Sequence, residues 1–315
     1  MLEENKEKLE KLLEEFLIGR DCNPDEAIKK INHLKNLSNK EAVSILNFFA
    51  GKETNPKVLL HIVQMIGKIK DKSSVEILIE ILTDYKNPEE QDKYLKIRCT
   101  TANILGDLKD DSAVVPLMYI MNDKNEYYKI RLSAAEALGR IGNVYAVAPL
   151  INIVTDEEEK SVYLRESAAK ALGMLGDERA VDPLISIIET KQGIVDKFTF
   201  LKEKTVEALG KLGFNQSKKL NALKKTLMDE SPQVRISAME ALCEIDDEVV
   251  TPLIESMLQD QDEDVAVSAV NALYNVEGRD FVINLLQKKD LSECCRSEIH
   301  EILEEDDDEE EEEDE

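Results

Sequence analysis

Tryptophan is absent from this chain of 315 residues, and aromatic residues make up only 5% of it. Histidine is almost as scarce, since His33, His61 and His300 are the three in the sequence and no two have the spacing of metal ligands. The P-loop, GxGxxG, GxSxG and HExxH patterns do not occur either. The sequence therefore predicts no catalytic residue, no metal site and no cofactor, which favours a non-enzymatic function.

Long hydrophobic runs are missing too, because no apolar stretch approaches the roughly 18 residues that a membrane helix needs. The N-terminal sequence MLEENKEKLEKLLEEF is charged throughout, unlike the apolar centre of a signal peptide. Cysteine is sparse and odd in number, and its scattered positions predict free thiols in a reducing compartment. The five cysteines are Cys22, Cys99, Cys243, Cys294 and Cys295. We expect a cytoplasmic protein that makes no contact with a membrane.

Basic residues are outnumbered, with 40 Lys and Arg against 66 Asp and Glu and a net charge of −26. Nucleic acid is an unfavourable partner for such a chain, because phosphate contacts need a broad basic surface and stacking aromatic side chains. Residues 304–315 are consecutive acids that bury no apolar surface and repel one another, so they are predicted to form a disordered tail. The tail would attract a basic partner, or serve only to keep the protein soluble.

One stretch departs from this acidic background, since residues 191–225 contain nine lysines against three acidic residues. The candidate basic patch consists of Lys191, Lys197, Lys202, Lys204, Lys211, Lys218, Lys219, Lys224 and Lys225. One hypothesis is that the acidic tail folds back onto this patch and competes there with a ligand, which would be autoinhibitory. The alternative is that these are scattered lysines on solvated helix faces.

The stretch Ile130 to Leu150, IRLSAAEALGRIGNVYAVAPL, is the unit around which the chain is organised. Its apolar residues recur at three- and four-residue intervals, which predicts an amphipathic helix. Gly139 and Gly142 are predicted to loosen and end that helix. A second helix begins near Val147 and carries Pro149 in its first turn, where the missing amide hydrogen matters least. The unit is therefore a helical hairpin.

Copies of this unit recur along most of the chain. The glycine after the recurring leucine is found at 67, 106, 139, 173 and 210, and the same position is then filled by Cys243 and Tyr274. The spacings are 39, 33, 34, 37, 33 and 31 residues, a period that indicates a helical solenoid. Two further markers keep the same register, an arginine eight residues before the glycine and a proline nine or ten after it. These markers are Arg98, Arg131, Arg165 and Arg235, and Pro116, Pro149, Pro183 and Pro252.

The best copies read IRLSAAEALGRIGNVYAVAPLINIV, LRESAAKALGMLGDERAVDPLISII and VRISAMEALCEIDDEVVTPLIESMLQD. They resemble the HEAT repeat family, in particular the E-Z type of repeat first described in phycobilisome bilin lyases. The resemblance implies an all-α fold, a right-handed α-α superhelix of about nine helical hairpins, similar to armadillo proteins. We expect residues 1–39 to form a capping hairpin, residues 40–303 the repeat array and residues 304–315 the tail.

The recurring arginines could form an anion-binding row. The alternative is structural, because Asp123, Asp156 and Asp229 end the helices that precede three of these arginines. That arrangement predicts a ladder of Asp–Arg hydrogen bonds between stacked turns.

The leading hypothesis for function is a scaffold or adaptor that binds another protein, a basic one for preference, by many shallow contacts. In related folds the helix carrying the repeat motif lines a concave face, and the predicted contact positions at one offset of this motif are Asn103, Glu136, Lys170, Glu207, Glu240 and Asn271. We expect a monomer or weak oligomer.

The runner-up is a bilin lyase-like or other tetrapyrrole-handling subunit, which the family resemblance alone suggests. A third alternative is a regulator that masks a basic nucleic-acid-binding protein. Another HEAT enzyme, deoxyhypusine hydroxylase, holds iron with His-Glu pairs, and only His300 and Glu301 match that pattern here.

Overall fold

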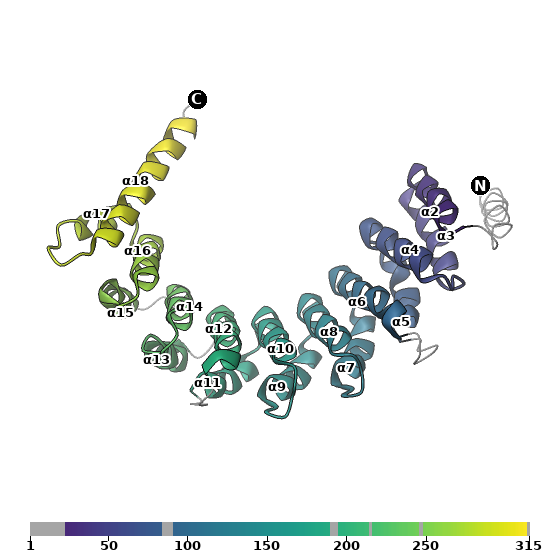
Figure 1. Ribbon diagram of the computed structural model, residues 1–315, viewed down its shortest axis with the longest axis horizontal. Coiled ribbons are helices and arrows are strands. Elements are labelled where there is room, and N and C mark those ends of the chain that lie inside the picture. The colour runs from purple at the N-terminus through teal and green to yellow at the C-terminus, as the bar shows by residue number, and fades with distance from the viewer. Residues whose placement is uncertain (1–22, 84–90, 190–194, 214–215, 246–247, 314–315) are drawn as a thin grey trace. The chain divides into compact units, whose positions relative to one another are not determined.

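The computed structural model describes residues 23–83, 91–189, 195–213, 216–245 and 248–313. Every regular element in these ranges is a helix (Figure 1), so the predicted all-α array of helical hairpins is confirmed. The chain divides into two compact units between Leu150 and Ile151, and the division falls inside α9 (Val147–Thr155). The two units are described separately.

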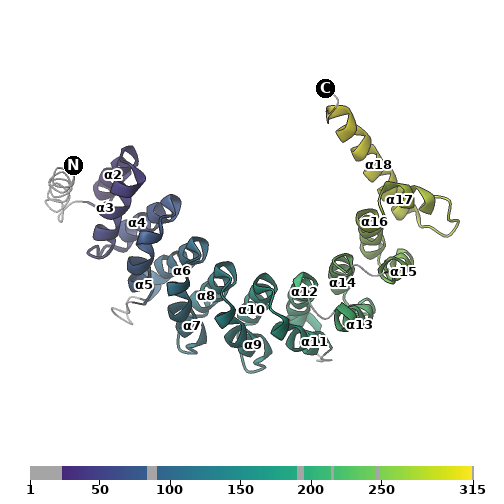
Figure 2. The same ribbon diagram turned by 180° about the vertical axis from the view of Figure 1, so that it is seen from behind.

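In the first unit, even- and odd-numbered helices form two rows that Figures 1 and 2 both show. The even row packs α4 against α6 and α6 against α8, and each odd helix packs against an even one. The helices are α2 (Pro24–His33), α3 (Asn39–Ala50), α4 (Pro56–Ile69), α5 (Val75–Thr83), α6 (Gln91–Leu108), α7 (Val114–Asn122) and α8 (Tyr128–Ile141). Of the predicted capping hairpin, the first helix lies outside the described residues and the second corresponds to α2.

The second unit repeats this arrangement, with successive even-numbered helices in contact from α10 to α18. Its helices are α10 (Val162–Leu175), α11 (Val181–Glu189), α12 (Val195–Lys211), α13 (Gln216–Thr226), α14 (Pro232–Cys243), α15 (Val250–Ser256), α16 (Glu263–Glu277), α17 (Arg279–Leu285) and α18 (Glu293–Glu313). Helix α18 continues into the acidic segment, whose composition predicts disorder. Glutamate has a good helix propensity, and the packed first turns of α18 supply the nucleus from which a helix can extend.

The recurring glycine sets how closely successive even-numbered helices approach. A Cβ atom at Gly106 would lie 2.8 Å from the Cα of Ala137, and one at Gly173 would lie 2.8 Å from the Cα of Ala208. These contacts are with backbone atoms, which cannot move aside as a flexible side chain can. The prediction that Gly139 loosens its helix is wrong, because Gly139 is buried inside α8 and the helix ends at Gly142.

In four copies the hairpin turn is built from two local features. The residue that ends the even-numbered helix has a positive φ, which is 58° at Lys70, 50° at Lys109, 83° at Gly142 and 66° at Gly176. The next residue, an Asp or Asn, accepts a hydrogen bond from the amide two residues further on and so starts a short 3₁₀ turn. These capping residues are Asp71, Asp110, Asn143 and Asp177. The turn thus depends on a left-handed residue that only glycine adopts without strain.

Substitutions at two copies of the left-handed position are expected to change stability in opposite directions. Gly142→Ala should lower the free energy of unfolding by about 1 kcal/mol, because a Cβ atom strains this backbone although nothing lies within 4 Å of it. Lys109→Gly should relieve the same strain and raise the free energy of unfolding by about 0.5 kcal/mol, since the extra freedom of glycine in the unfolded chain offsets part of the gain. Urea denaturation followed by circular dichroism measures both, and equal shifts of the same sign would contradict this account of the turn.

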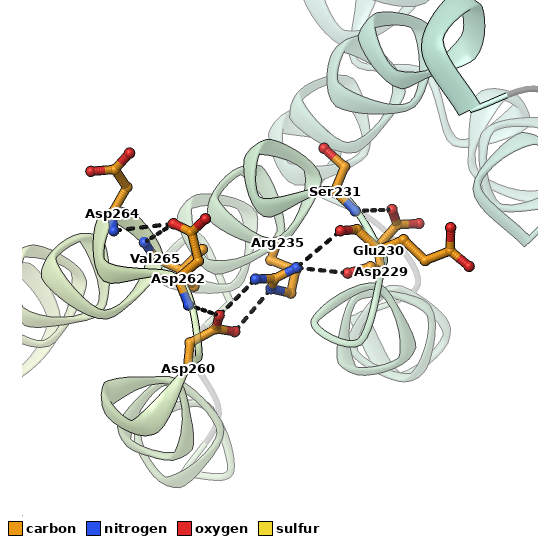
Figure 3. A network of polar contacts seen from close by, with 8 residues as sticks. All are labelled: Asp229, Glu230, Ser231, Arg235, Asp260, Asp262, Asp264 and Val265. Carbon is orange, nitrogen blue, oxygen red and sulfur yellow. Dashed lines mark hydrogen bonds and ion pairs between the residues drawn. The ribbon is translucent and has the colours of Figure 1, made fainter.

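Buried arginines join one repeat to the next. Arg98 donates from Nε to the carbonyl of Leu82 at 2.8 Å and from Nη2 to Glu126 at 2.6 Å. Arg235 forms a bidentate pair with Asp260, at 2.9 Å from Nε and 2.6 Å from Nη2 (Figure 3). These guanidinium groups therefore satisfy the carbonyl end of the preceding helix, an acid of the following repeat, or both.

Of the predicted Asp–Arg hydrogen bonds, the structure shows the one between Arg235 and Asp229, and it uses the main chain of Asp229 and not its carboxylate. Arg235 Nη1 donates to the main-chain carbonyl of Asp229 at 2.9 Å, while the Asp229 carboxylate accepts from Lys202 at 2.8 Å. The acid that pairs with Arg98, Lys202 or Arg235 thus comes from the loop before the next even-numbered helix. The four motif arginines are 4 to 7% exposed, so they cannot act as a surface row that binds anions.

Candidate functional site

A groove opens between α14 and α16 in the second unit, where the repeat departs from its usual close packing. The position that holds glycine in five earlier copies is Cys243 in α14 and Tyr274 in α16. Ala272 corresponds to the alanines that the glycines meet, and here the Cys243 sulfur lies 3.9 Å from the Ala272 carbonyl oxygen. Because a thiol fills the space that glycine leaves empty, the two helices cannot approach as closely.

The groove has a volume of about 850 Å³ and is open to solvent on one side. Its walls combine apolar side chains with carboxyl, amide and hydroxyl groups, and no basic side chain takes part. The lining residues are Ile236, Met239, Glu240, Cys243, Glu244, Ile245, Ser268, Asn271, Ala272, Asn275 and Val276. An apolar floor with two exposed carboxylates suits a ligand that carries both a positive charge and an apolar body.

The groove offers no activated nucleophile. Burial raises the pKa of the Cys243 thiol to about 11, and the nearby negative charges of Glu244 and Glu240 act in the same direction. A thiol with such a pKa stays protonated at neutral pH, whereas the thiolate is the reactive form. The chemistry of these residues therefore supports binding rather than covalent catalysis.

Two of the six predicted contact positions, Glu240 and Asn271, line this groove. Glu240 is exposed, whereas the Asn271 amide donates to Glu298 of α18 at 2.6 Å and so links α16 to α18. In the same unit Lys170 is exposed on α10 and Glu207 accepts from Lys204 at 2.5 Å.

The other two predicted positions lie in the first unit. Asn103 accepts a hydrogen bond from Arg140 at 2.8 Å, and Glu136 is half-buried on α8. The structure does not unite all six residues in one cavity, since the groove contains only the two from α14 and α16.

Most of the predicted basic patch does not offer free positive charge. Four of its lysines form ion pairs, at 2.5 to 2.8 Å, and these are Lys202, Lys204, Lys218 and Lys225. Lys219 cannot belong to a surface patch, because it is 2% exposed and its ammonium group donates to the carbonyls of Gly210 and Leu212. Lys211 and Lys224 are exposed, while Lys191 and the side chain of Lys197 lie outside the described residues.

Helices α10 and α12 carry a half-buried and a buried glutamate, Glu166 and Glu203. Burial raises the pKa of Glu166 and of Glu203 above the usual range for glutamate. Among the described residues, no group of three or more His, Cys, Asp or Glu side chains is arranged to hold a metal ion. None of the described helices combines the length and apolar character needed to span a bilayer.

The sequence matches the family described as HEAT repeats over residues 89–162, 124–199, 192–274 and 220–299. These overlapping segments together run from residue 89 to residue 299, which is more than half of the chain. A comparison with curated proteins found no match.

Solved structures of similar fold include the karyopherin Kap121p bound to the extreme C-terminus of the protein phosphatase Cdc14p. It has a TM-score of 0.53 and 14% identity, over 93% of this chain and 37% of the karyopherin. Kap121p bound to Nup53p has a TM-score of 0.50 and 13% identity, over 93% of this chain and 36% of that one. The complex of CpcE and CpcF of phycocyanin lyase from Nostoc sp. PCC7120 has a TM-score of 0.46 and 23% identity, over 72% and 92%. At these identities the likeness shows the fold alone.

Proposed function

Because the chain belongs to the HEAT-repeat family, we propose that it is a non-enzymatic scaffold that binds a segment of another protein along its even-numbered helices. The proposal rests on the groove between α14 and α16, because a cavity lies there between two successive even-numbered helices. Lys170 and Glu207 would add shallow contacts along the even-numbered helices of the second unit, and Asn103 and Glu136 would do so within the first unit.

The lining of the groove indicates the chemistry of the bound segment. Glu240 and Glu244 place two exposed carboxylates beside the apolar side chains of Ile236 and Met239. A lysine or arginine next to an aliphatic residue complements both features, because the long stem of a basic side chain packs on apolar surface while its charged end reaches the carboxylates. The partner segment we propose is therefore basic and partly apolar.

The lining also bears on the tetrapyrrole alternative. Bilins carry propionate groups, which need cationic or hydrogen-bond-donating partners in a binding site. The groove instead presents the carboxylates of Glu240 and Glu244 and contains no lysine, arginine or histidine. Its electrostatic character therefore favours a basic protein segment over an anionic chromophore.

The acidic residues 304–315 are proposed to raise the rate at which a basic partner meets the groove, through long-range attraction that salt would screen. The autoinhibitory alternative has less support. Of the lysines in its proposed docking surface, Lys219 is buried and four others are already paired, as Lys218 is with Asp182.

Charge reversal in the groove tests the proposed function. Twelve-residue peptides selected from a displayed random library on the purified protein should be enriched in Lys or Arg beside aliphatic residues. The double variant Glu240→Lys/Glu244→Lys should weaken their binding by about 100-fold, because two attractive contacts become repulsive. Fluorescence anisotropy with labelled peptides gives the dissociation constants.

The matched control is Glu248→Lys/Asp280→Lys, which makes the same change of charge at exposed positions outside the groove. This control should weaken binding by about threefold or less, through the general loss of negative charge. If both double variants weakened binding equally, or if acidic peptides were enriched, the groove would not be the binding site.

A further inference from the structure

The contact between α6 and α8 in the first unit contains an arginine that the groove between α14 and α16 lacks. Arg140 of α8 donates from Nη2 to the side-chain oxygen of Asn103 on α6 at 2.8 Å, and its Nε lies 3.1 Å from the Asp107 carboxylate. Asn103 and Asp107 are four residues apart, so their side chains lie on one face of α6. Two acceptors on one helix thus hold a guanidinium group that the next even-numbered helix supplies.

Helix α14 repeats the two acceptors, but α16 does not repeat the arginine. Counted from the position of the recurring glycine, Glu240 and Glu244 of α14 stand at the same two positions as the acceptors of α6. In α16, Asn275 stands where α8 has its arginine. Both glutamates are exposed, and two like charges four residues apart on a helix repel one another. The groove therefore offers the acceptors of an arginine site without the arginine.

Lys219 does not supply the missing charge. Burial lowers the pKa of Lys219, and the charge of Glu244 acts against that shift. The ammonium group is nevertheless buried, and it donates to the main-chain carbonyls of Gly210 and Leu212 and not to a carboxylate. Lys219 is also not among the residues that line the groove. Glu240 and Glu244 are therefore open to a cation from another protein.

Helix α16 adds a third acceptor to the groove. The Asn271 amide donates from Nδ2 to the Glu298 carboxylate of α18 at 2.6 Å. An ionised carboxylate only accepts hydrogen bonds, so this contact fixes which way round the amide lies and leaves Oδ1 as an acceptor on the groove wall. A guanidinium group carries several N–H donors in a planar fork and can serve acceptors on two helices at once, whereas an ammonium group is a point charge.

We propose that the groove binds the side chain of an arginine from the partner segment, in the way that α6 binds the arginine of α8. This inference rests on the proposed function and identifies which basic residue the groove selects. The two sites differ in the path of the side chain. Arg140 lies over Gly106, where a Cβ atom would come within 2.8 Å of its Nε. The groove has Cys243 at that position, so its arginine must enter from the side that is open to solvent.

Three labelled eight-residue peptides test this selection, with leucine alternating with arginine, lysine or citrulline. The arginine peptide should bind about tenfold or more tightly than the lysine peptide, because its planar fork meets more of the acceptors. Citrulline has nearly the shape of arginine without its charge, and its peptide should bind about 100-fold or more weakly than the arginine peptide. Fluorescence anisotropy gives the three dissociation constants.

Asn275→Arg places the missing guanidinium group on α16 itself. The variant should bind the arginine peptide about tenfold or more weakly, because its own arginine occupies Glu240 and Glu244. It is expected to fold, since the added charge relieves the repulsion between these two carboxylates. Asn284→Arg is the matched control, because it makes the same substitution at an exposed position of α17 outside the groove. This control should weaken binding by about twofold or less.

Equal affinities for the arginine and lysine peptides, or equal losses in Asn275→Arg and Asn284→Arg, would overturn the inference. The proposed function would survive either outcome if Glu240→Lys/Glu244→Lys still weakened binding of both charged peptides. Charge reversal without effect on either peptide would instead remove the proposed function, and the inference with it.

Discussion

Arg235→Met is expected to lower the free energy of unfolding by about 3 to 5 kcal/mol, the largest stability effect of any substitution considered for this chain. The side chains of Arg235 and Asp260 are 5% and 9% exposed, and their two hydrogen bonds measure 2.9 and 2.6 Å. Methionine fills most of the same space but leaves the Asp260 carboxylate buried without a cation. Figure 3 shows that Arg235 also donates to the main chain at Asp229, and that contact would be lost as well. Urea denaturation followed by circular dichroism gives the change.

A double-mutant cycle distinguishes the ion pair from lost packing. Asp260→Ala removes the buried carboxylate, so the double variant Arg235→Met/Asp260→Ala no longer contains an unpaired charge. Its loss of stability should be smaller than the sum of the two single losses by at least about 1 kcal/mol. Strictly additive losses would show that the pair contributes nothing beyond the packing of its two side chains.

Gly173→Val is expected to lower the free energy of unfolding by about 3 kcal/mol. Valine has the better helix propensity, worth a few tenths of a kcal/mol here. That gain is smaller than the cost of forcing two helices apart, because even the first carbon of the side chain would lie 2.8 Å from the Cα of Ala208. The backbone of α12 would therefore have to move away from α10. Differential scanning calorimetry and urea denaturation measure the loss.

Gly213→Ala is the matched control for this prediction. Gly213 is exposed, and a Cβ atom placed on it would meet nothing within 4 Å. Its free energy of unfolding should change by about 0.5 kcal/mol or less. If Gly173→Val were as mild as this control, close approach would not be the reason for glycine at this position of the repeat.

The repeat architecture could be predicted from the sequence because its period and its amphipathic pattern are local properties of the chain. The helical hairpins follow from the spacing of residues such as Arg131, Gly139 and Pro149. The structural role of Gly139 could not be predicted from such local patterns. Helix propensity treats a glycine as a weak point, whereas the structure buries Gly139 inside α8. At the equivalent Gly106 and Gly173, the backbone of the next even-numbered helix leaves no room for a side chain.

Lys219 shows the same limit for a charged residue. In four other copies its position holds a small buried residue, which is Ser74, Ala113, Ala146 or Ala180. The copy that contains Lys219 has no left-handed residue at the end of its even-numbered helix among the described residues. The Lys219 ammonium group instead donates to the carbonyl of Gly210 near the end of α12, at 3.1 Å, and to the carbonyl of Leu212 just after the helix. Counting lysines places this residue in a basic patch, because composition does not distinguish a helix cap from a surface charge.

The candidate groove was only partly predictable. Glu240 and Asn271 follow from their offset in the repeat, and both line the groove. The replacement of glycine by Cys243 and Tyr274 is visible in the sequence, and it marks the place where two helices lie too far apart for the usual contact. The meaning of this replacement becomes clear only when the structure shows that glycine lets successive even-numbered helices approach closely in other copies.

The most direct measurement of the central claim is site-specific photo-crosslinking in native extract, with benzoylphenylalanine in place of Ser268 in the groove or Asn284 on α17. The account predicts adducts at position 268 with a protein segment that contains Lys or Arg beside aliphatic residues. These adducts should disappear in the Glu240→Lys/Glu244→Lys background and should not form at position 284. Equal crosslinking at both positions, or an acidic segment captured at position 268, would contradict the claim that this groove binds a basic partner.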